Sequence, residues 1–545
     1  MKLNIFKNIA PVALAALVGF SSTACMNDLD QSIKDPQTNT ELDVTGLLTK
    51  IYGSLVLTGQ TGGSGNPDMS QFDEGNSAFY RRIFEANELC SDECIWTWQG
   101  DTGIPELTNI SWNSTHGYNE LTYYRTMYNV TLCNYYLQET EGTTDAEVLQ
   151  NRAEVRFVRA LMNFHFIDLF GRAPYKTVVD ETLPVEKTRS EIFKIVEDEL
   201  LSIIDDSNDE HLADFNGDDA NYGRADKVAA KMLLARLYLN AKVYLGTSQW
   251  DNEMLKKAKQ YADEVIASKY KLNTTALNGR SAYEQLFMGD NGENPNARQE
   301  IIFPIRCDGA TSRSYGGSMY PIASCTGDGT PDQGLPSSMW TCNRARQSLV
   351  DKFISNGSSL NGKSISAHDF AALAGDDRAL LFVSDNRVYE TEEKTTFTAG
   401  FAILKWTNEY AQGGTPSDVS FPDTDVPYLR VAEAYLTRAE ANFRLGDVEE
   451  AKKDLNVLRD RAHAAEFDQS ISEQDIIDEW CREFYMEGRR RSDLIRFGQF
   501  TGSAYVWDWK GGVYAGTGVE SFYDLYPIPY AETSANENMH QNTGY

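Results

Sequence analysis

The chain has 545 residues, of which 41% are hydrophobic and 11% aromatic, and its formal net charge at pH 7 is −30. A chain of this length can form one large domain or two to three smaller ones with well-filled cores. The strongly acidic balance argues against nucleic acid as a partner, because binding to phosphates relies on Lys and Arg, and it is compatible with neutral ligands.

Residues 1–24 predict a secretion signal. Lys2 and Lys7 precede the apolar stretch PVALAALVGF, which is too short to span a bilayer. Small residues then lead to Cys25, an arrangement that resembles the bacterial lipoprotein signal, in which the cysteine is acylated. Ser22 stands where such signals usually have leucine, so an ordinary secretory signal with cleavage nearby is the alternative. Acylation would tether the chain to a membrane. The polar composition of residues 25–42 predicts that they form the tether between the lipid and the folded domain.

The composition of residues 53–117 predicts a loop-rich surface. Long irregular segments on a compact scaffold usually carry function, so this surface is a candidate binding region. The stretch ECIWTWQGD places Trp96 and Trp98 two residues apart, so a strand would direct both rings to one side. Both rings could be buried, or both could stack on the apolar face of a sugar. Asp73 and Arg81, just upstream, would supply charge-assisted hydrogen bonds to its hydroxyl groups. The residues themselves leave both interpretations open.

Three blocks with helical periodicity, residues 151–175, 223–268 and 428–462, predict a mainly α fold. In the third block a Leu-Gly-Asp turn separates two helices, and Ala439 and Leu455 fall where the tetratricopeptide pattern of roughly 34 residues places packing residues. The blocks therefore predict a tetratricopeptide-like scaffold of helical hairpins.

Residues 291–420 predict a second loop-rich region, rich in Gly, Ser, Asn and Pro, in which aromatic residues such as Tyr315 and Trp340 stand apart from any helical pattern. The acidic segments 289–296 and 421–427 contain the oxygen ligands that calcium takes, although neither fits the EF-hand spacing. Solvated loops are the favoured interpretation of both segments.

The sequence contains no zinc-protease, hydrolase or nucleotide-binding motif, and its six histidines have no metal spacing. His165 lies in an aromatic helical block and is predicted to be buried and hydrogen-bonded. A glycosidase needs only two carboxylates, which spacing cannot exclude in a chain with 80 acidic residues. The eight cysteines form no CxxC pair, so neither a disulfide framework nor a zinc site is indicated, and most are predicted to be buried.

Over nearly its whole length the chain resembles the SusD/RagB family of outer-membrane nutrient-binding lipoproteins. The blocks that carry the resemblance are RAEVRFVRALMNFHFIDLFGRAPY, GRADKVAAKMLLARLYLNA, YLRVAEAYLTRAEANFRLGD, EWCREFYMEGRRRSDLIRFG and the terminal YPIPYAETSANENMHQNTGY. The loops DEGNSAFYR, NELCSDECIWTWQ, SYGGSMY and YVWDWKGG are similar to those of starch-binding members. Since loops in this family diverge with the ligand, their similarity points to starch.

The resemblance implies a single SusD-like domain over residues 43–545, with no catalysis and no required cofactor. Such a protein is lipid-anchored through Cys25 at the outer-membrane surface. It holds starch, amylose, malto-oligosaccharides or cyclodextrin-like glucans and passes them to a SusC-like TonB-dependent porin. The positions that the resemblance assigns to carbohydrate binding are an arc of three rings, Trp98, Tyr315 and Trp340, with Trp96 beside them, and the polar Asp73, Arg81 and Asp101.

Two of the implied sites depart from the family pattern. Asp101 stands where the starch-binding relative has asparagine, and a carboxylate accepts hydrogen bonds but donates none. A structural calcium site in that relative matches Asp423 and Asp425, while a third ligand position falls on Gly292. Two other functions stay open: a family member that binds a different glycan, and a protein that acts mainly as a structural lid of the transporter.

Overall fold

The computed structural model describes residues 43–59, 63, 67–69, 74–215 and 219–545. The chain forms two compact units, 1–45 and 46–545. Of the first unit only residues 43–45 are described. The predicted signal, the tether and the acylation site Cys25 therefore lie outside the described residues and stay predictions.

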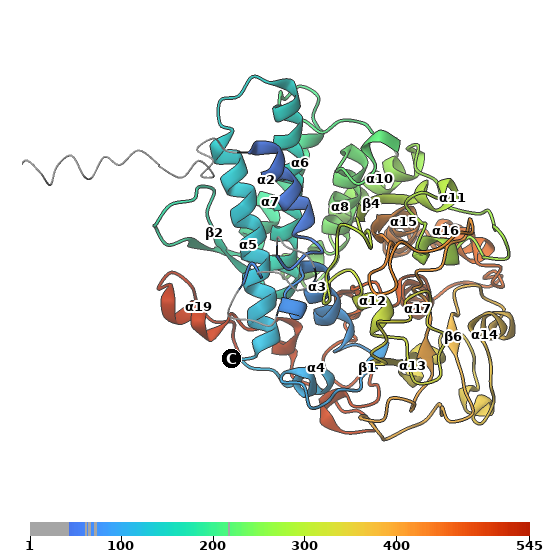
Figure 1. Ribbon diagram of the computed structural model, residues 1–545. Coiled ribbons are helices and arrows are strands. Elements are labelled where there is room, and N and C mark those ends of the chain that lie inside the picture. The colour runs from blue at the N-terminus through green and yellow to red at the C-terminus, as the bar shows by residue number, and fades with distance from the viewer. Residues whose placement is uncertain (1–42, 60–62, 64–66, 70–73, 216–218) are drawn as a thin grey trace, which may run out of the picture. The chain divides into compact units, whose positions relative to one another are not determined.

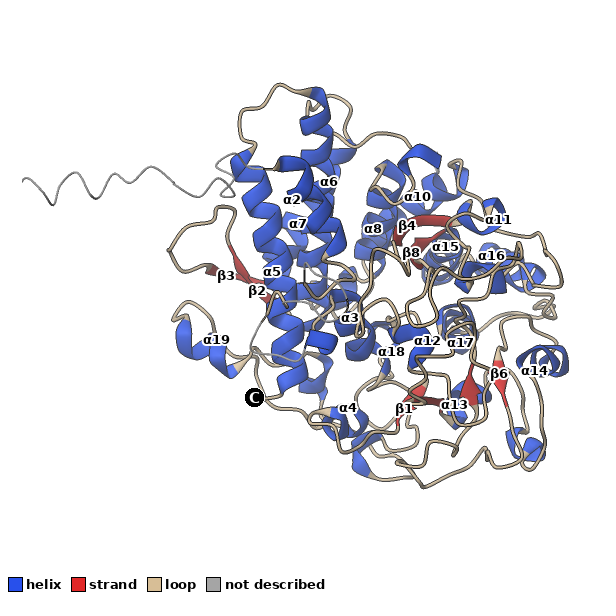
Figure 2. Ribbon diagram, in the orientation of Figure 1, coloured by secondary structure: helices blue, strands red, loops and turns tan. Residues whose placement is uncertain are grey.

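The described part of the chain is mainly α-helical (Figure 2), as the periodicity predicts. The longer helices are α2 (Val44–Gly53), α3 (Phe79–Glu88), α5 (Gly117–Glu139), α6 (Ala146–Leu169), α7 (Arg189–Ile204), α8 (Lys227–Leu239), α10 (Asn252–Ala267), α15 (Val431–Leu445), α16 (Val448–Arg461) and α17 (Glu473–Phe484). The shorter helices are α4 (Ile104–Asn109), α9 (Ala241–Tyr244), α11 (Pro295–Arg298), α12 (Tyr320–Ala323), α13 (Gln347–Val350), α14 (Ala367–Ala374), α18 (Arg490–Arg496) and α19 (Tyr530–Ala535). Single 3₁₀ turns are η1 (Glu74–Asn76), η2 (Asp219–Asn221), η3 (Glu284–Phe287), η4 (Gly357–Leu360), η5 (Lys510–Gly512) and η6 (Ser521–Asp524).

The strands are short and pair two by two in antiparallel fashion. The pairs are β1 (Cys94–Trp96) with β5 (Asn343–Ala345), β2 (Arg172–Tyr175) with β3 (Val185–Thr188), β4 (Ile301–Ile305) with β8 (Val426–Arg430), and β6 (Leu381–Phe382) with β7 (Ala402–Ile403). The β1–β5 and β4–β8 ladders join segments that are distant in sequence, and each ladder of the described residues has only two strands.

The longer helices pack in a continuous row in which α5, α6, α7, α8, α10, α15 and α16 each contact the next (Figure 1). Helix α15 follows α10 in space although residues 268–430 separate them in sequence. That inserted segment carries most of the irregular chain, and its longest helix is α14 with 8 residues. The predicted scaffold of helical hairpins with a loop-rich face is confirmed.

Local sequence explains where several of these helices begin and end. The side chain of Asp145 accepts hydrogen bonds from two N–H groups in the first turn of α6. Thr188 and Glu191 form a reciprocal capping box at the start of α7. Helix α15 ends at Leu445 because the next residue, Gly446, has a φ of 95°, in the left-handed region that glycine adopts without strain. Each N-cap stabilises its helix by about 1 kcal/mol.

A buried ion network joins α17 to β8 and to the end of α16. Its members are fully buried: Arg378, Arg430, Arg461, Glu300, Glu479 and Glu483. Burial alone would raise the pKa of the Glu483 carboxyl, but the three guanidinium groups outweigh burial and hold that pKa well below its ordinary range. Removing one partner from such a network typically costs about 3–5 kcal/mol, because it leaves an uncompensated buried charge.

The predicted loop-rich region 53–117 is more ordered than its composition indicates, because it contains α3, whose ten residues are all buried. The arginines of this helix are tolerated there because Arg81 and Arg82 both pair with Glu85. The seven cysteines of the described chain are buried and unpaired. Within the described ranges, no helix combines the length and the apolar character needed to cross a bilayer.

Candidate functional site

The β1–β5 ladder brings together two segments that lie about 250 residues apart in sequence. Its register pairs Cys94 with Ala345 and Trp96 with Asn343. The pairing continues one step beyond the strands, where the N–H of Thr97 donates to the carbonyl oxygen of Cys342 at 2.7 Å. Trp98 and Trp340 follow at the same end of the ladder, so backbone hydrogen bonds determine the spacing between their chain segments.

The two tryptophans of the ECIWTWQGD stretch have different environments. Trp96 is 1% exposed, and its ring stacks on Tyr320 with centroids 5.8 Å apart and planes 10° apart. Trp98 is 38% exposed and meets the edge of Trp96 at 6.1 Å and 83°. The chain turns directly after Trp98, since the N–H of Asp101 donates to the Trp98 carbonyl at 3.0 Å. Trp96 therefore supports Trp98, and Trp98 presents the exposed ring.

Trp340 is positioned by the backbone on both of its sides. Its N–H donates to the carbonyl of Ala323 at 2.7 Å, and its ring lies 6.3 Å from that of Tyr320. The next residue, Thr341, has a φ of 54°, which is unusual for a β-branched residue. Hydrogen bonds from its N–H and its Oγ1 to the carbonyl of Thr326 hold this bend. Trp340 is half-buried, with Tyr320 packed between it and Trp96.

Tyr315 is presented by two glycines that pack against other parts of the chain. The Tyr315 side chain is 48% exposed, and its ring lies 5.0 Å from that of Phe421. A Cβ atom on Gly316 would lie 1.0 Å from the carbonyl oxygen of Gly75, and one on Gly317 would lie 1.9 Å from that of Val56. Only glycine allows this approach, so the two glycines after Tyr315 pack directly against η1 and the turn that follows α2.

Arg81 links η1 to the aromatic residues. Its Nε contacts Glu85 at 2.7 Å and its Nη1 donates to the Gly75 carbonyl at 2.8 Å. The guanidinium lies 4.7 Å from the ring centroid of Tyr320 and 5.9 Å from that of Trp340. Burial lowers the pKa of Arg81, but the Glu85 carboxylate outweighs burial, so the group stays charged.

These residues surround one open groove of about 500 Å³. The residues that line it are Gly75, Asn76, Arg81, Trp96, Trp98, Asp101, Thr102, Tyr118, Tyr315 and Trp340. Six of the seven residues assigned to carbohydrate binding from sequence are thus brought together. The seventh, Asp73, lies outside the described residues. Sequence reasoning missed Asn76, Thr102 and Tyr118, and the first turn of α5 gave no local signal that Tyr118 would face this groove.

The groove can bind a ring-shaped polar molecule. Its half-exposed rings offer flat apolar area for C–H faces, while Arg81, Asn76 and Asp101 offer donors and acceptors for hydroxyl groups. Asp101 is the one carboxylate among the described residues that line the groove. The flat rings and the polar side chains beside them together give the groove the features of a binding surface.

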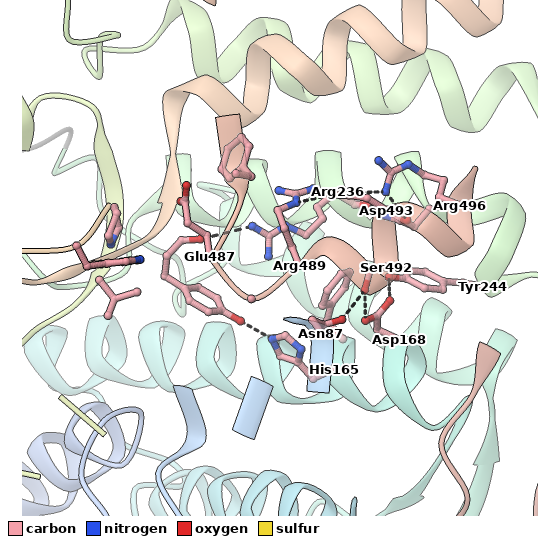
Figure 3. A pocket seen from close by; sticks show the side chains of 18 residues that line it. Asn87, His165, Asp168, Arg236, Tyr244, Glu487, Arg489, Ser492, Asp493 and Arg496 are labelled. Atoms are coloured by element: carbon pink, nitrogen blue, oxygen red, sulfur yellow. Dashed lines mark hydrogen bonds and ion pairs between the residues drawn. The ribbon is translucent and has the colours of Figure 1, made fainter. Parts of the chain in front are cut away.

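A smaller hollow lies in the interior, between α6, α18 and β8 (Figure 3). His165 is hydrogen-bonded there to the hydroxyl of Tyr428, as predicted for a buried histidine, and Asp168 accepts from Tyr244 and Ser492. The cavity of about 40 Å³ has room for about two or three water molecules and none for a sugar.

The two carboxylates assigned to calcium already accept hydrogen bonds from the protein. Asp423 accepts from the N–H of Gly309 at 3.0 Å and from Tyr410 at 2.8 Å, and Asp425 accepts from the N–H of Cys307 at 2.7 Å. No cluster of three metal-binding side chains occurs within the described ranges. Calcium also takes backbone and amide oxygens as ligands, and the calcium site stays a prediction.

Comparison with known proteins gives both a family and a fold. The sequence model of the SusD family matches residues 380–545. The chain is 45% identical to the starch-binding protein SusD of Bacteroides thetaiotaomicron, in an alignment that covers 100% of both chains.

Solved structures resemble this chain at low sequence identity. Surface glycan-binding protein A from Bacteroides uniformis has a TM-score of 0.66 at 19% identity, covering 92% of this chain and 98% of its own. The protein of the same name from Bacteroides thetaiotaomicron, solved with laminarihexaose, has a TM-score of 0.62 at 19% identity over the same shares. At this identity the likeness shows the fold alone.

Proposed function

We propose a function from one premise: this chain belongs to the SusD family. It is a non-catalytic binding protein for starch, which holds α-1,4-glucan chains and malto-oligosaccharides in the groove lined by Trp98, Tyr315 and Trp340. The 45% identity to a starch-binding protein along the whole chain supports this substrate class. The observation that carries the proposal is the convergence of three exposed or half-exposed rings, from three separate segments of the chain, on one groove.

The binding mode follows from the chemistry of that groove. The rings stack on the apolar faces of successive glucose units, each contributing roughly 0.5–1.5 kcal/mol beyond the burial of area. Arg81 and Asp101 bind hydroxyl groups at the edges of the sugar rings. Because each contact is modest, affinity depends on a ligand that touches all three rings together, which favours long or cyclic glucans over glucose.

Isothermal titration calorimetry with maltoheptaose, α-cyclodextrin, laminarihexaose and cellohexaose tests the substrate class. We expect binding of the two α-1,4-linked ligands and no measurable binding of the two β-linked ones. Preference for a β-linked chain would contradict the starch proposal and favour a family member that binds a different glycan. Incubation with maltoheptaose should release no shorter products.

The family resemblance also supports a location and a partner. We propose that Cys25 is acylated, that the protein is held at the outer surface of the outer membrane, and that it delivers glucan to a SusC-like TonB-dependent porin. Replacing Cys25 by alanine should release the protein from the membrane fraction. Copurification of a porin from native membranes tests the partner. If the porin copurifies and growth on starch survives the loss of all three rings, the protein acts mainly as a lid.

A further inference from the structure

Phe397 is an exposed ring at the rim of the glucan groove. It is 37% exposed, and the other phenylalanines that the structure describes are buried or half-buried. Its ring centroid lies 6.2 Å from that of Trp98, with the planes tilted by 54°. Phe397 is absent from the residues that line the groove, so it flanks Trp98 outside the groove.

Two buried arginines fix the loop that carries Phe397. Arg344 donates from Nη1 to the carbonyl of Thr396 at 2.7 Å and also binds the carbonyl of Glu393. Arg387 donates to the carbonyl of Phe397 itself at 3.4 Å and to that of Gly400 at 3.1 Å. Burial lowers the pKa of both guanidinium groups to about 10, so both remain charged at neutral pH.

The same ladder that positions Trp98 positions this loop. Arg344 lies on β5 and pairs in register with Ile95 of β1. The N–H of Ala345, the next residue of β5, donates to the carbonyl of Phe401 at 2.9 Å. Phe397 is therefore held at a fixed place relative to Trp98 and Trp340.

We propose that Phe397 is a fourth sugar-contacting ring, which touches a glucan chain only where the chain extends beyond Trp98 and so sets a preference for longer chains. The inference rests on the proposed function. A phenylalanine face offers the flat apolar area on which the C–H face of a sugar packs, and it adds no hydrogen bond that would fix the direction of the chain. A ligand short enough to lie within the groove does not reach it.

Titration calorimetry on the full protein with the series from maltotriose to maltoheptaose tests the role of Phe397. For Phe397→Ala we expect the affinity for maltotriose to stay within about twofold of the wild type and the affinity for maltoheptaose to fall about three- to tenfold, in line with the loss of one stacked ring. Phe397→Tyr keeps the ring and should retain the wild-type dependence on chain length. Leu373→Ala, which removes a side chain 58% exposed on α14, is the matched control and should change neither affinity.

The outcomes separate this inference from the proposed function. Unchanged binding of maltoheptaose by Phe397→Ala would overturn the fourth ring while leaving the starch site intact. An equal loss across the series would also overturn it, because Phe397 would then act only by positioning Trp98. Failure of the wild type to bind any member of the series would overturn the proposed function itself.

Discussion

The N–H of Thr97 donates to the carbonyl oxygen of Cys342 at 2.7 Å, one step beyond the last pair of the β1–β5 ladder. This hydrogen bond joins the segments that present Trp98 and Trp340. The spacing between the two chain segments is thus determined by main-chain hydrogen bonds, which do not involve the side chain of Trp98 or of Trp340. A groove built in this way allows each ring to be removed while the others keep their places.

Replacing Trp98 by alanine should weaken maltoheptaose binding at least tenfold, which corresponds to about 1.4 kcal/mol, because a 38% exposed ring is lost from the groove. Tyr315→Ala and Trp340→Ala should act in the same direction. Titration calorimetry measures the change, and Tyr530→Ala, at an aromatic residue 63% exposed on α19, is the control. Wild-type affinity in Trp98→Ala would show that the groove is not the glucan site.

Replacing Gly316 by alanine should destabilise the protein by about 1–3 kcal/mol and weaken glucan binding, because the new Cβ would lie 1.0 Å from the carbonyl oxygen of Gly75. The loop must move, and Tyr315 moves with it. Urea unfolding and calorimetry measure the two effects. Gly117→Ala, at a glycine with no heavy atom within 4 Å of the added Cβ, is the matched control and should unfold like the wild type or at slightly higher urea. Equal behaviour of the two variants would rule out the close approach.

Replacing Asp101 by asparagine should increase the affinity for maltoheptaose about two- to fivefold. The carboxylate at the groove wall only accepts hydrogen bonds, whereas an amide also donates, and one net hydrogen bond is worth about 0.5–1.5 kcal/mol. In Asp101→Ala the side chain can neither accept nor donate a hydrogen bond, so this variant should bind maltoheptaose more weakly than the wild type. If Asp101→Asn and Asp101→Ala weaken binding alike, the carboxylate itself is the required acceptor.

The stability of the protein should fall in acid partly because of His165. Burial lowers the pKa of His165 from its ordinary value of 6.5 to about 3. Between these values the unfolded chain binds a proton that the folded chain excludes. The contribution of His165 is therefore complete above pH 6.5 and decreases as the pH falls toward 3, by up to about 1.4 kcal/mol per pH unit.

His165→Gln provides the comparison for this prediction. The glutamine cannot be protonated, so urea unfolding of the variant should depend less steeply on pH between 6.5 and 4 than that of the wild type. Parallel curves for the two proteins would mean that His165 accepts its proton in the folded state.

The helical scaffold is predictable from the sequence because helical periodicity is a local property. The apolar spacing within residues 151–175 and 428–462 indicates α6, α15 and α16 before any tertiary contact is known. Helix α3 escapes prediction because its arginines break the apolar pattern. They are buried beside Glu85, on the same helix, which forms an ion pair with each of them.

The site is less accessible to sequence reasoning because its parts meet through non-local contacts. The alternation of side chains along a strand predicts that the rings of Trp96 and Trp98 are both buried or both exposed. However, β1 ends at Trp96 and the chain turns at Trp98, so the first ring is buried and the second is exposed. Trp98 and Trp340 line the same groove because β1 pairs with β5, and no local sequence pattern predicts this pairing. Only resemblance to a family indicates it in advance. Tyr118 and Phe397 have no such signal.

The seven buried thiols of the described residues can report local opening of the folded protein. A water-borne alkylating reagent cannot reach their sulfur atoms in the closed molecule, and burial raises the pKa of Cys90 to about 11 and that of Cys133 to about 12, so little reactive thiolate forms. A cysteine that becomes labelled must therefore have been exposed to solvent when the structure around it opened. Cys133 lies on α5, at one end of the helical row, and Cys481 lies on α17, which packs against α15. The position of the label within the digested chain therefore identifies which of these two regions opened first.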